Sequence, residues 1–142
     1  MIEPAAYDND NIFAKILRGE MPCHKVFEDD NTFVFMDIMP RSQGHCLVIP
    51  KAPSRNILDA DSGSLAAVID TTQRLSRAVV KAFDADGVTI HQFNEPAAGQ
   101  IVYHLHFHVI PRFAGVKLQP HTGEMEDNEV LKANAAKIRQ AL

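Results

Sequence analysis

The stretch "GQIVYHLHFHVIPR" (99–112) decides both the fold and the site. It places histidines at every second position, His104, His106 and His108, with apolar residues between them. In an extended strand alternate residues share one face, so the three imidazoles are expected to form a row while the intervening residues point into a core. The sequence therefore predicts a strand over 101–111 whose polar face carries a site.

Three explanations of the histidine row stay open on the residues alone. A metal site would need a further ligand from elsewhere in the chain, which His45 or His91 could supply. The three histidines could also be surface or core residues with no shared task. Finally, neutral imidazole has a free pKa of about 6.5 and is a nucleophile near neutral pH when its second nitrogen is fixed as a donor. A phosphoryl centre suits this last explanation, because flanking imidazoles can stabilise its charge.

Composition limits the class of protein. The chain has 142 residues, of which 46% are hydrophobic, so a single domain with a real core is expected. Its net charge is −4 and it has no Lys/Arg block, which disfavours a nucleic-acid polymer as partner. Cys23 and Cys46 form no C-x-x-C pair, although a disulfide between them stays open. Without a signal-peptide pattern or a long apolar run, no membrane span and a cytoplasmic location are expected.

The remaining pattern predicts an α+β domain. Residues 64–84 carry apolar side chains at helical spacing and form the longest expected helix, with Ser62 or Ser64 as its N-cap. Strands in hairpin-like succession indicate an antiparallel sheet of about five strands, with helices packed on one side. The other expected elements are a helix within 8–22 capped by Asp10 or Asn11, strands at 25–30, 32–38, 45–50 and 87–94, and a helix within 126–141.

Several motifs together carry a family resemblance. "HLHFHVI" fits the H-φ-H-φ-H-φ-φ signature, and "NIFAKILRGEMP", "VFEDDNTFVFMDIMP" and "GHCLVIPK" look like further blocks of the same family. From about residue 11 to 112 the chain resembles the histidine triad (HIT) family, closest to its bacterial adenosine phosphoramidase-like branch. The resemblance implies one HIT-like domain over 1–142. Its C-terminal segment, 113–142, matches least well and is expected to help form the leaving-group pocket.

The resemblance implies a nucleotide hydrolase or transferase that cleaves at an α-phosphate. His106 would be the nucleophile and would form a covalent nucleotidyl-histidine, which water then hydrolyses. His108 would contact the phosphate and the leaving-group bridge, while His104 and His45 would support the nucleophile and tune protons. This chemistry requires no metal and no cofactor.

The resemblance also implies a set of substrate-binding residues. Asp37 would accept hydrogen bonds from the ribose hydroxyls, and Phe35 would pack against the base. Asn94 and Gln100 match polar positions that contact the phosphate, and Gly99 would let the backbone approach closely. The alternatives are a strand-end acid for Asp37, a core residue for Phe35 and a turn residue for Asn94.

The chain departs from the family pattern at a few positions. Ile101 stands where many phosphoramidases have Ser or Thr, so that side-chain contact to phosphate or leaving group is lost. Asn11 and Ala14 stand where some bacterial members have a cysteine pair, and Pro53 stands where a histidine would help, so no structural zinc is expected. Three histidines have no place in the motif and are expected at the surface or at edges: His24, His91 and His121.

Three functions compete, and a metal-binding module is the last alternative. The first is hydrolysis of purine nucleoside phosphoramidates of the AMP–amine type. The second is hydrolysis of dinucleoside polyphosphates by the same kind of site. The third is a nucleotide-binding or scaffolding protein with weak catalysis. The expected partners are a purine nucleotide and a second copy of the chain, since family members are usually homodimers built on the long helix.

Overall fold

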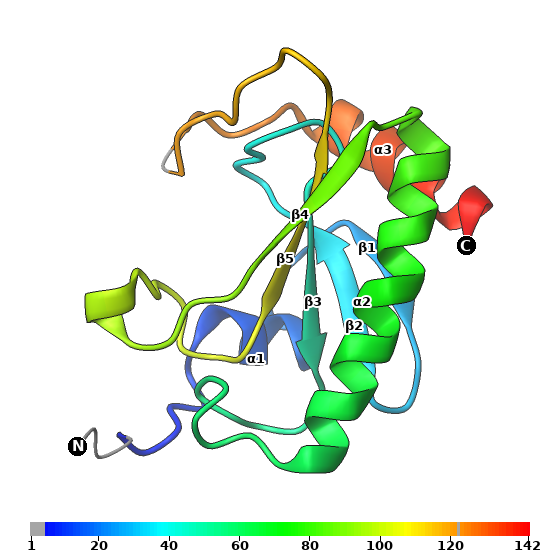
Figure 1. Ribbon diagram of the computed structural model, residues 1–142. Helices are drawn as coiled ribbons and strands as arrows, with labels where there is room; N and C mark the ends of the chain where they lie inside the picture. The colour runs from blue at the N-terminus through cyan, green and yellow to red at the C-terminus, as the bar shows by residue number, and fades with distance from the viewer. Residues whose placement is uncertain (1–4, 122) are drawn as a thin grey trace.

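The computed structural model describes residues 5–121 and 123–142, which form an antiparallel sheet with helices on both faces (Figure 1). This architecture confirms the predicted α+β class. In chain order the elements are α1 (Ile12–Leu17), β1 (Lys25–Glu28), β2 (Thr32–Met36), β3 (Cys46–Pro50), α2 (Ser62–Phe83), β4 (Gly87–His91), the 3₁₀ turn η1 (Pro96–Ala98), β5 (Phe107–Arg112) and α3 (Asn128–Ala141).

The strands lie in the order β1-β2-β3-β5-β4, and every neighbouring pair is antiparallel. The first three strands form a meander. The chain then crosses through α2 to the edge strand β4 and returns as β5 between β3 and β4. This return makes β5 an inner strand and pairs His108 with Leu47 on one side and with His91 on the other.

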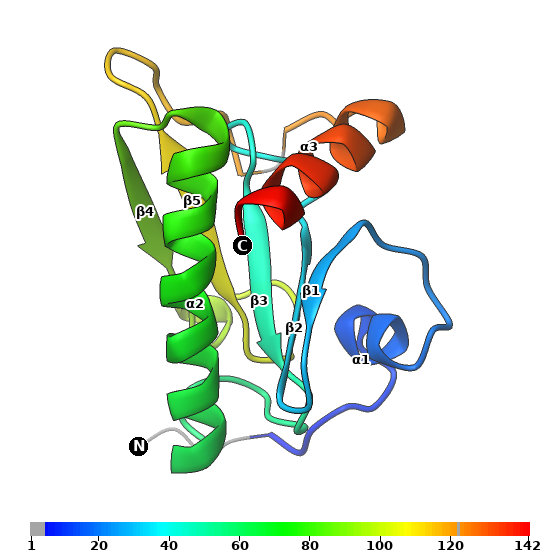
Figure 2. The same ribbon diagram turned by 90° about the vertical axis from the view of Figure 1, so that its right-hand side faces the viewer.

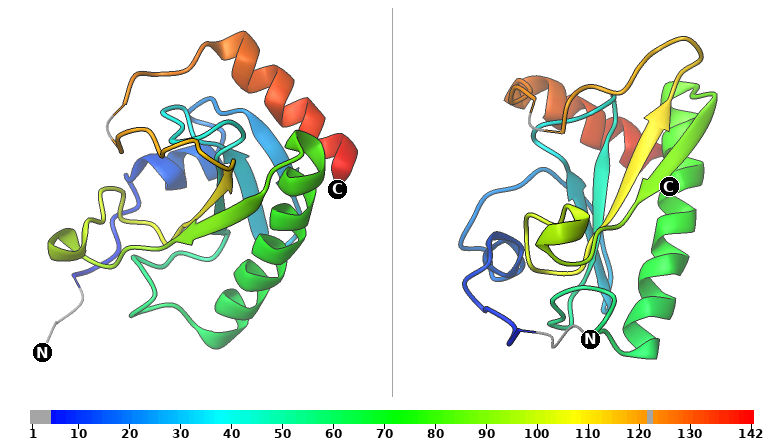
Figure 3. Two further views of the ribbon diagram at one scale, coloured as in Figure 1. Left: turned by 45° about the horizontal axis from the view of Figure 1, so that its top comes forward. Right: turned by 60° about the vertical axis from the view of Figure 1, so that its left-hand side comes forward.

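Both faces of the sheet are covered. Helices α2 and α3 pack against one face, and α1 lies against the other (Figure 2, Figure 3). The expectation that all helices pack on one side is therefore wrong for α1. The physical reason lies in β2 and β3, whose residues are buried at every position and so need apolar cover on both sides. The core residues on the α1 face are Phe13, Phe33, Phe35, Leu47 and Ile49.

The predicted strand over 101–111 is correct only in its second half, because β5 begins at Phe107. Leu105 is fully buried in the α2–α3 core as expected, but its backbone N–H donates to Ser54 O rather than to a strand. His104 and His106 therefore precede the sheet. The histidines do not form one straight row, and their rings point to different partners.

The helix caps follow the sequence only in part. Asn11 caps α1 as predicted, with its side-chain oxygen accepting from the Ala14 N–H at 2.9 Å. The cap of α2 is Asp61, which accepts from the Ser64 N–H at 2.8 Å, rather than Ser62 or Ser64. Helix α2 thus begins two residues before the predicted range, and its first residue is one of the expected caps.

Two smaller expectations also have outcomes. Cys46 is buried in β3 and Cys23 is half-buried, and both are free thiols, so they form no disulfide. Within residues 5–121 and 123–142, no helix combines the length and the apolarity needed to cross a bilayer.

We predict that Gly44→Ala destabilises the fold strongly. Gly44 has φ +86°, and a Cβ there would clash with the aromatic ring of Phe83 at the end of α2. Strain and overpacking together should lower the free energy of unfolding by about 3 kcal/mol. Gly19→Ala is the matched control, because Gly19 has φ +77° with nothing within 4 Å, and should cost about 1 kcal/mol. Urea unfolding measures both, and equal losses would contradict the clash.

Candidate active site

A cavity of about 370 Å³ opens between α1, the segment after β2 and the loop before β5. Its size is that of a small-molecule site. One end is apolar and is lined by Ile12, Phe13, Ile16, Met21, Pro22 and Phe35. The polar and titratable side chains that line the cavity are those of Asp37, Arg41, His45, His106, His108 and His121. The cavity thus offers an apolar wall for a flat ring system beside a cluster of imidazoles.

His106 presents a bare nitrogen. Its Nδ1–H donates to the carbonyl oxygen of His104 at 2.7 Å, so the proton of the neutral ring is on Nδ1 and Nε2 carries a lone pair. The ring is 7% exposed and meets the Phe13 ring edge-on at 4.9 Å between centroids. Burial lowers the pKa of His106 to about 4, despite the opposing hydrogen bond to His104. The ring is therefore unprotonated at Nε2 at neutral pH.

A chain of hydrogen bonds fixes the protons of His45 and His108. The Arg41 backbone N–H can only donate, and it reaches Nδ1 of His45 at 3.1 Å. The proton of His45 is therefore on Nε2, which donates to Nδ1 of His108 at 2.9 Å. It follows that His108 carries its proton on Nε2 and can donate it to a ligand. Burial is the main cause that lowers the pKa of both rings, so both are neutral.

His104 lies behind the cavity and supports it. Its Nε2–H donates to the carbonyl oxygen of Pro50 at 2.8 Å, which leaves Nδ1 to accept from the hydroxyl of Tyr7. The ring is fully buried, and burial lowers its pKa. Its supporting role comes through its carbonyl, which holds His106. Sequence reasoning gave no signal for Tyr7, because its partner is 97 positions away.

Asp37 lies beside the His45–His108 pair. Its Oδ1 accepts from the Met39 N–H at 2.9 Å, and its Oδ2 is 3.5 Å from Nε2 of His45 and 3.9 Å from Nδ1 of His108. Burial raises the pKa of this carboxyl to about 6. It is ionised at neutral pH and can accept hydrogen bonds from ligand hydroxyl groups.

Asp37, His45 and His108 also form a cluster with metal-ligand chemistry, since one atom of each lies within 4.8 Å of the others. The proton assignment does not suit a cation there. Nε2 of His45 carries its proton, and the bare Nδ1 is held by the Arg41 N–H. A metal would have to displace that backbone bond and leave the half-buried Arg41 N–H without its imidazole partner. The absence of a metal site stays a prediction.

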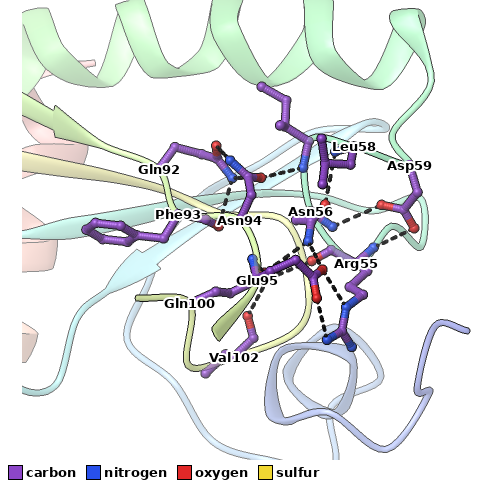
Figure 4. Close-up of polar contacts among 11 residues, drawn as sticks. Arg55, Asn56, Leu58, Asp59, Gln92, Phe93, Asn94, Glu95, Gln100 and Val102 are labelled. Carbon is purple, nitrogen blue, oxygen red and sulfur yellow. Dashed lines mark hydrogen bonds and ion pairs between the residues drawn. The ribbon is translucent and has the colours of Figure 1, made fainter. Parts of the chain in front are cut away.

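The side chain of Gln100 is fully occupied inside the protein (Figure 4). Its Oε1 accepts from the Glu95 N–H at 2.7 Å and from the Asn56 amide at 3.1 Å. Its Nε2 donates to the carbonyl oxygens of Arg55 at 2.8 Å and Val102 at 3.0 Å. All of its donors and acceptors have partners, and it does not line the cavity. Its predicted phosphate contact stays a prediction.

Asn94 and its neighbours hold the loop between β4 and β5 (Figure 4). Oδ1 of Asn94 accepts from the Ile57 N–H at 2.9 Å, and its amide donates to Gln92 at 2.6 Å. Glu95 has φ +76° and is held by two hydrogen bonds from the Arg55 guanidinium at 2.8 and 3.0 Å. This anchored loop places Gly99, with φ +96°, in the cavity wall, and its close backbone approach to a nucleotide stays a prediction.

The structure adds residues that the sequence did not identify. Phe93 and His121 line the cavity, and His121, expected at the surface or at an edge, is half-buried there. The His121 ring lies 5.9 Å from that of His108, between centroids. The C-terminal segment matches the family pattern poorly, so nothing in the sequence indicated that His121 belongs to the cavity. His91 is at the edge strand β4, and the His24 ring bonds the Asn128 side chain at 3.3 Å in an exposed position, as expected for residues outside the motif.

The comparisons with known proteins agree with this geometry. The model of the HIT domain matches residues 18–115. The chain belongs to the HIT family. The structure of the Hit-like protein of Bartonella henselae, described as involved in cell-cycle regulation and holding an unknown ligand, has a TM-score of 0.91 and 55% identity over 96% of this chain and 100% of that one.

Two relatives in this HIT family carry the names of enzymes. Adenylylsulfatase HINT3 of Arabidopsis thaliana is 39% identical over 78% of this chain, which spans only 56% of that protein's length. Adenosine 5'-monophosphoramidase hnt1 of Schizosaccharomyces pombe is 38% identical over 71% of this chain and 73% of its own.

We predict that the buried histidines of this HIT domain make its stability fall in acid. An unfolded histidine takes up a proton near pH 6.5, whereas the pKa of folded His106 is about 4. The unfolded state therefore binds more protons as the pH falls from about 6.5 to 4, which lowers the free energy of unfolding, by roughly 3 kcal/mol for a ring with this shift. His106→Gln removes this titrating group, so its free energy of unfolding should fall less steeply between pH 7 and 4 than that of the wild type. Urea unfolding over this pH range measures the difference.

Asp37→Asn supplies a control of opposite sign. The folded pKa of Asp37 is about 6 and lies above its unfolded value, so the native state takes up this proton first and gains stability as the pH falls below 6. Removing the carboxyl group should therefore make the free energy of unfolding fall more steeply in acid than it does in the wild type. If both variants changed the slope in the same direction, the assigned charge states would be contradicted.

Proposed function

We propose that this HIT protein hydrolyses purine nucleoside phosphoramidates of the AMP–amine type through a covalent nucleotidyl-histidine on His106. The observation that carries the proposal is the pair of fixed imidazoles in the cavity. Nε2 of His106 is bare, and the neighbouring His108, at 5.1 Å between ring centroids, presents an N–H. A nucleophile and a donor for phosphate oxygens are thus held side by side.

In the first step Nε2 of His106 attacks the α-phosphorus. A phosphorus–nitrogen bond to His106 forms, the bond to the amine breaks with its electron pair going to the amine nitrogen, and that nitrogen takes up a proton that comes from solvent. No base is needed for the attack, because burial already keeps Nε2 unprotonated. The N–H of His108 stabilises the charge on the phosphate oxygens, and its proton stays in place through the bond from His45.

In the second step a water molecule attacks the phosphorus of the nucleotidyl-histidine. The bond to Nε2 breaks, AMP leaves, the water proton goes to solvent, and His106 returns to its neutral form. The hydrogen bond from Nδ1 of His106 to the carbonyl oxygen of His104 is kept in both steps. The ring therefore leaves the phosphorus with its proton still on Nδ1. The apolar wall with Phe35 suits a purine base, and Asp37 suits the ribose.

The named relatives support a nucleotide hydrolase in general but do not identify the leaving group. A dinucleoside polyphosphate hydrolase would use the same nucleophile with a nucleotide as the leaving group. We favour the amine because adenosine 5'-monophosphoramidases are among the relatives. Comparing kcat/KM on an AMP–alkylamine and on a diadenosine polyphosphate decides between the two substrate classes. Faster cleavage of the polyphosphate would favour the dinucleoside polyphosphate hydrolase.

We predict a transient mass gain of one adenylyl group when the protein meets an AMP–alkylamine. Alkaline denaturing quench preserves phosphorus–nitrogen bonds to histidine, and intact-mass analysis then detects the adduct. His106→Ala should give no adduct and lose turnover by at least 10³-fold, because it removes the nucleophile. His24→Gln, outside the cavity, should behave as the wild type.

A mass gain that survived in His106→Ala would place the covalent bond elsewhere. AMP binding without adduct or turnover on any leaving group would favour the nucleotide-binding protein instead.

We further propose that two copies associate through the face formed by α2 and β4. Ile69 on α2 is 52% exposed and Ile90 on β4 is 43% exposed, and β4 is an edge strand. An apolar face beside an unpaired edge is a surface that a second chain can cover. We predict that Ile69→Lys combined with Ile90→Lys shifts the sedimentation coefficient from dimer to monomer. Met125→Lys, at a 68% exposed residue outside this face, should leave the assembly unchanged, and a dimer in all variants would refute the proposed interface.

A further inference from the structure

The C-terminal segment brings a further imidazole to the cavity from outside the histidine motif. The ring of His121 contacts the edges of His108 at 5.9 Å and Phe93 at 6.0 Å, between centroids, and it lines the same cavity. The Phe93 ring is itself 5.7 Å from His108. Three rings from three separate segments thus meet at one wall. We propose that His121 is the proton donor for the departing amine, an inference that rests on the proposed phosphoramidate hydrolysis.

The backbone on both sides of His121 is tied to the loop after β2. Gln119 makes two hydrogen bonds with Arg41, its N–H donating to Arg41 O at 2.8 Å and its carbonyl accepting from Arg41 Nε at 3.0 Å. On the far side, the Glu126 N–H donates to Ile38 O at 2.9 Å. The same loop carries the backbone N–H of Arg41 that fixes His45. The position of His121 is therefore set by the loop that also sets the tautomers of the site.

Ring contacts connect the apolar wall to His121 through His106. Phe13 packs on both Phe35 and His106. His108 in turn contacts both His106 and His121. With the base against the apolar wall and the α-phosphorus at His106, we place the leaving group on the His121 side of the cavity.

The other imidazoles of the cavity have no proton to give. An amine needs a proton as its bond to phosphorus breaks. His106 uses its only proton to bond His104, and the loss of a proton from neutral His45 or His108 would create an imidazolate. The side chain of Ile101, which also lines the cavity, has no proton to donate. A half-exposed imidazole avoids this problem, because it can take a replacement proton from solvent.

The proposed step forms one bond, breaks another and moves one proton. His106 Nε2 forms its bond to phosphorus, the phosphorus–amine bond breaks with its electron pair going to nitrogen, and protonated His121 transfers one proton to that nitrogen. Neutral His121 then regains a proton from water. General acid catalysis of this kind contributes about 10²–10⁴-fold to a rate.

The test compares leaving groups with and without a need for a proton. The substrates are an AMP–alkylamine and adenosine 5'-fluorophosphate, whose fluoride leaves as an anion, and kcat/KM reports the step in which either departs. We expect His121→Gln to lower kcat/KM for the alkylamine by at least 100-fold and for the fluoride by less than 3-fold. His24→Gln is the matched control and should change neither value. Across a series of AMP–amine substrates, kcat/KM of His121→Gln should also depend more steeply on the basicity of the amine than kcat/KM of the wild type does.

The outcomes separate the two proposals. Equal losses on both substrates would show that His121 only shapes the cavity and would overturn the inference. Unchanged kcat/KM on the amine would do the same. His121→Ala provides a second variant with the same expected selectivity, and thermal melting confirms that both are folded. If wild type cleaved neither substrate and formed no adduct on His106, the proposed function itself would fail, and this inference with it.

Discussion

Backbone groups fix the proton of each buried imidazole, and the chemistry of the site depends on this constraint. A main-chain N–H can only donate and a carbonyl can only accept. The Arg41 N–H therefore sets the tautomer of His45, and the carbonyls of Pro50 and His104 set those of His104 and His106. Side-chain partners such as hydroxyl groups could reverse their roles, but these main-chain groups cannot. One ring is thereby a permanent acceptor in the cavity and its neighbour a permanent donor.

The sheet topology makes this possible. Because β5 returns between β3 and β4, His108 is paired with Leu47, and His45 lies two residues before Leu47 on the adjoining strand end. Residues related in this way are diagonal neighbours on one face of an antiparallel pair, close enough for ring nitrogens to bond. The late start of β5 is equally important. Since His104 and His106 lie before the sheet, their main-chain groups are available to the site instead of to a strand.

The sequence predicted what depends on side-chain type and spacing, and missed what depends on main-chain partners. The motif "HLHFHVI" pointed to His104, His106 and His108, the block "GHCLVIPK" pointed to His45, and the apolar spacing predicted α2. Alternation of apolar and polar residues continues through "HLHFHV", so nothing in it could reveal that Leu105 bonds to Ser54 rather than to a strand. Likewise, an amide such as that of Gln100 looks like a ligand contact until its four internal partners are known. His121 needed the fold, because only the tie between Gln119 and Arg41 brings it to the cavity.

Burial solves one chemical problem at this site and creates another. Desolvation keeps His106 free of a proton well below neutral pH, so a nucleophile is always available. The same desolvation leaves His45, His104 and His108 neutral. The protons of His45 and His104 are committed to hydrogen bonds within the protein, and the single proton of His108 is needed to keep that ring neutral. A reaction whose leaving group departs as an anion can proceed in such a site. One whose leaving group needs a proton requires a donor that is in the cavity wall yet in exchange with solvent. A residue from a segment outside the buried core can meet both conditions, and the half-buried position of His121 is of this kind.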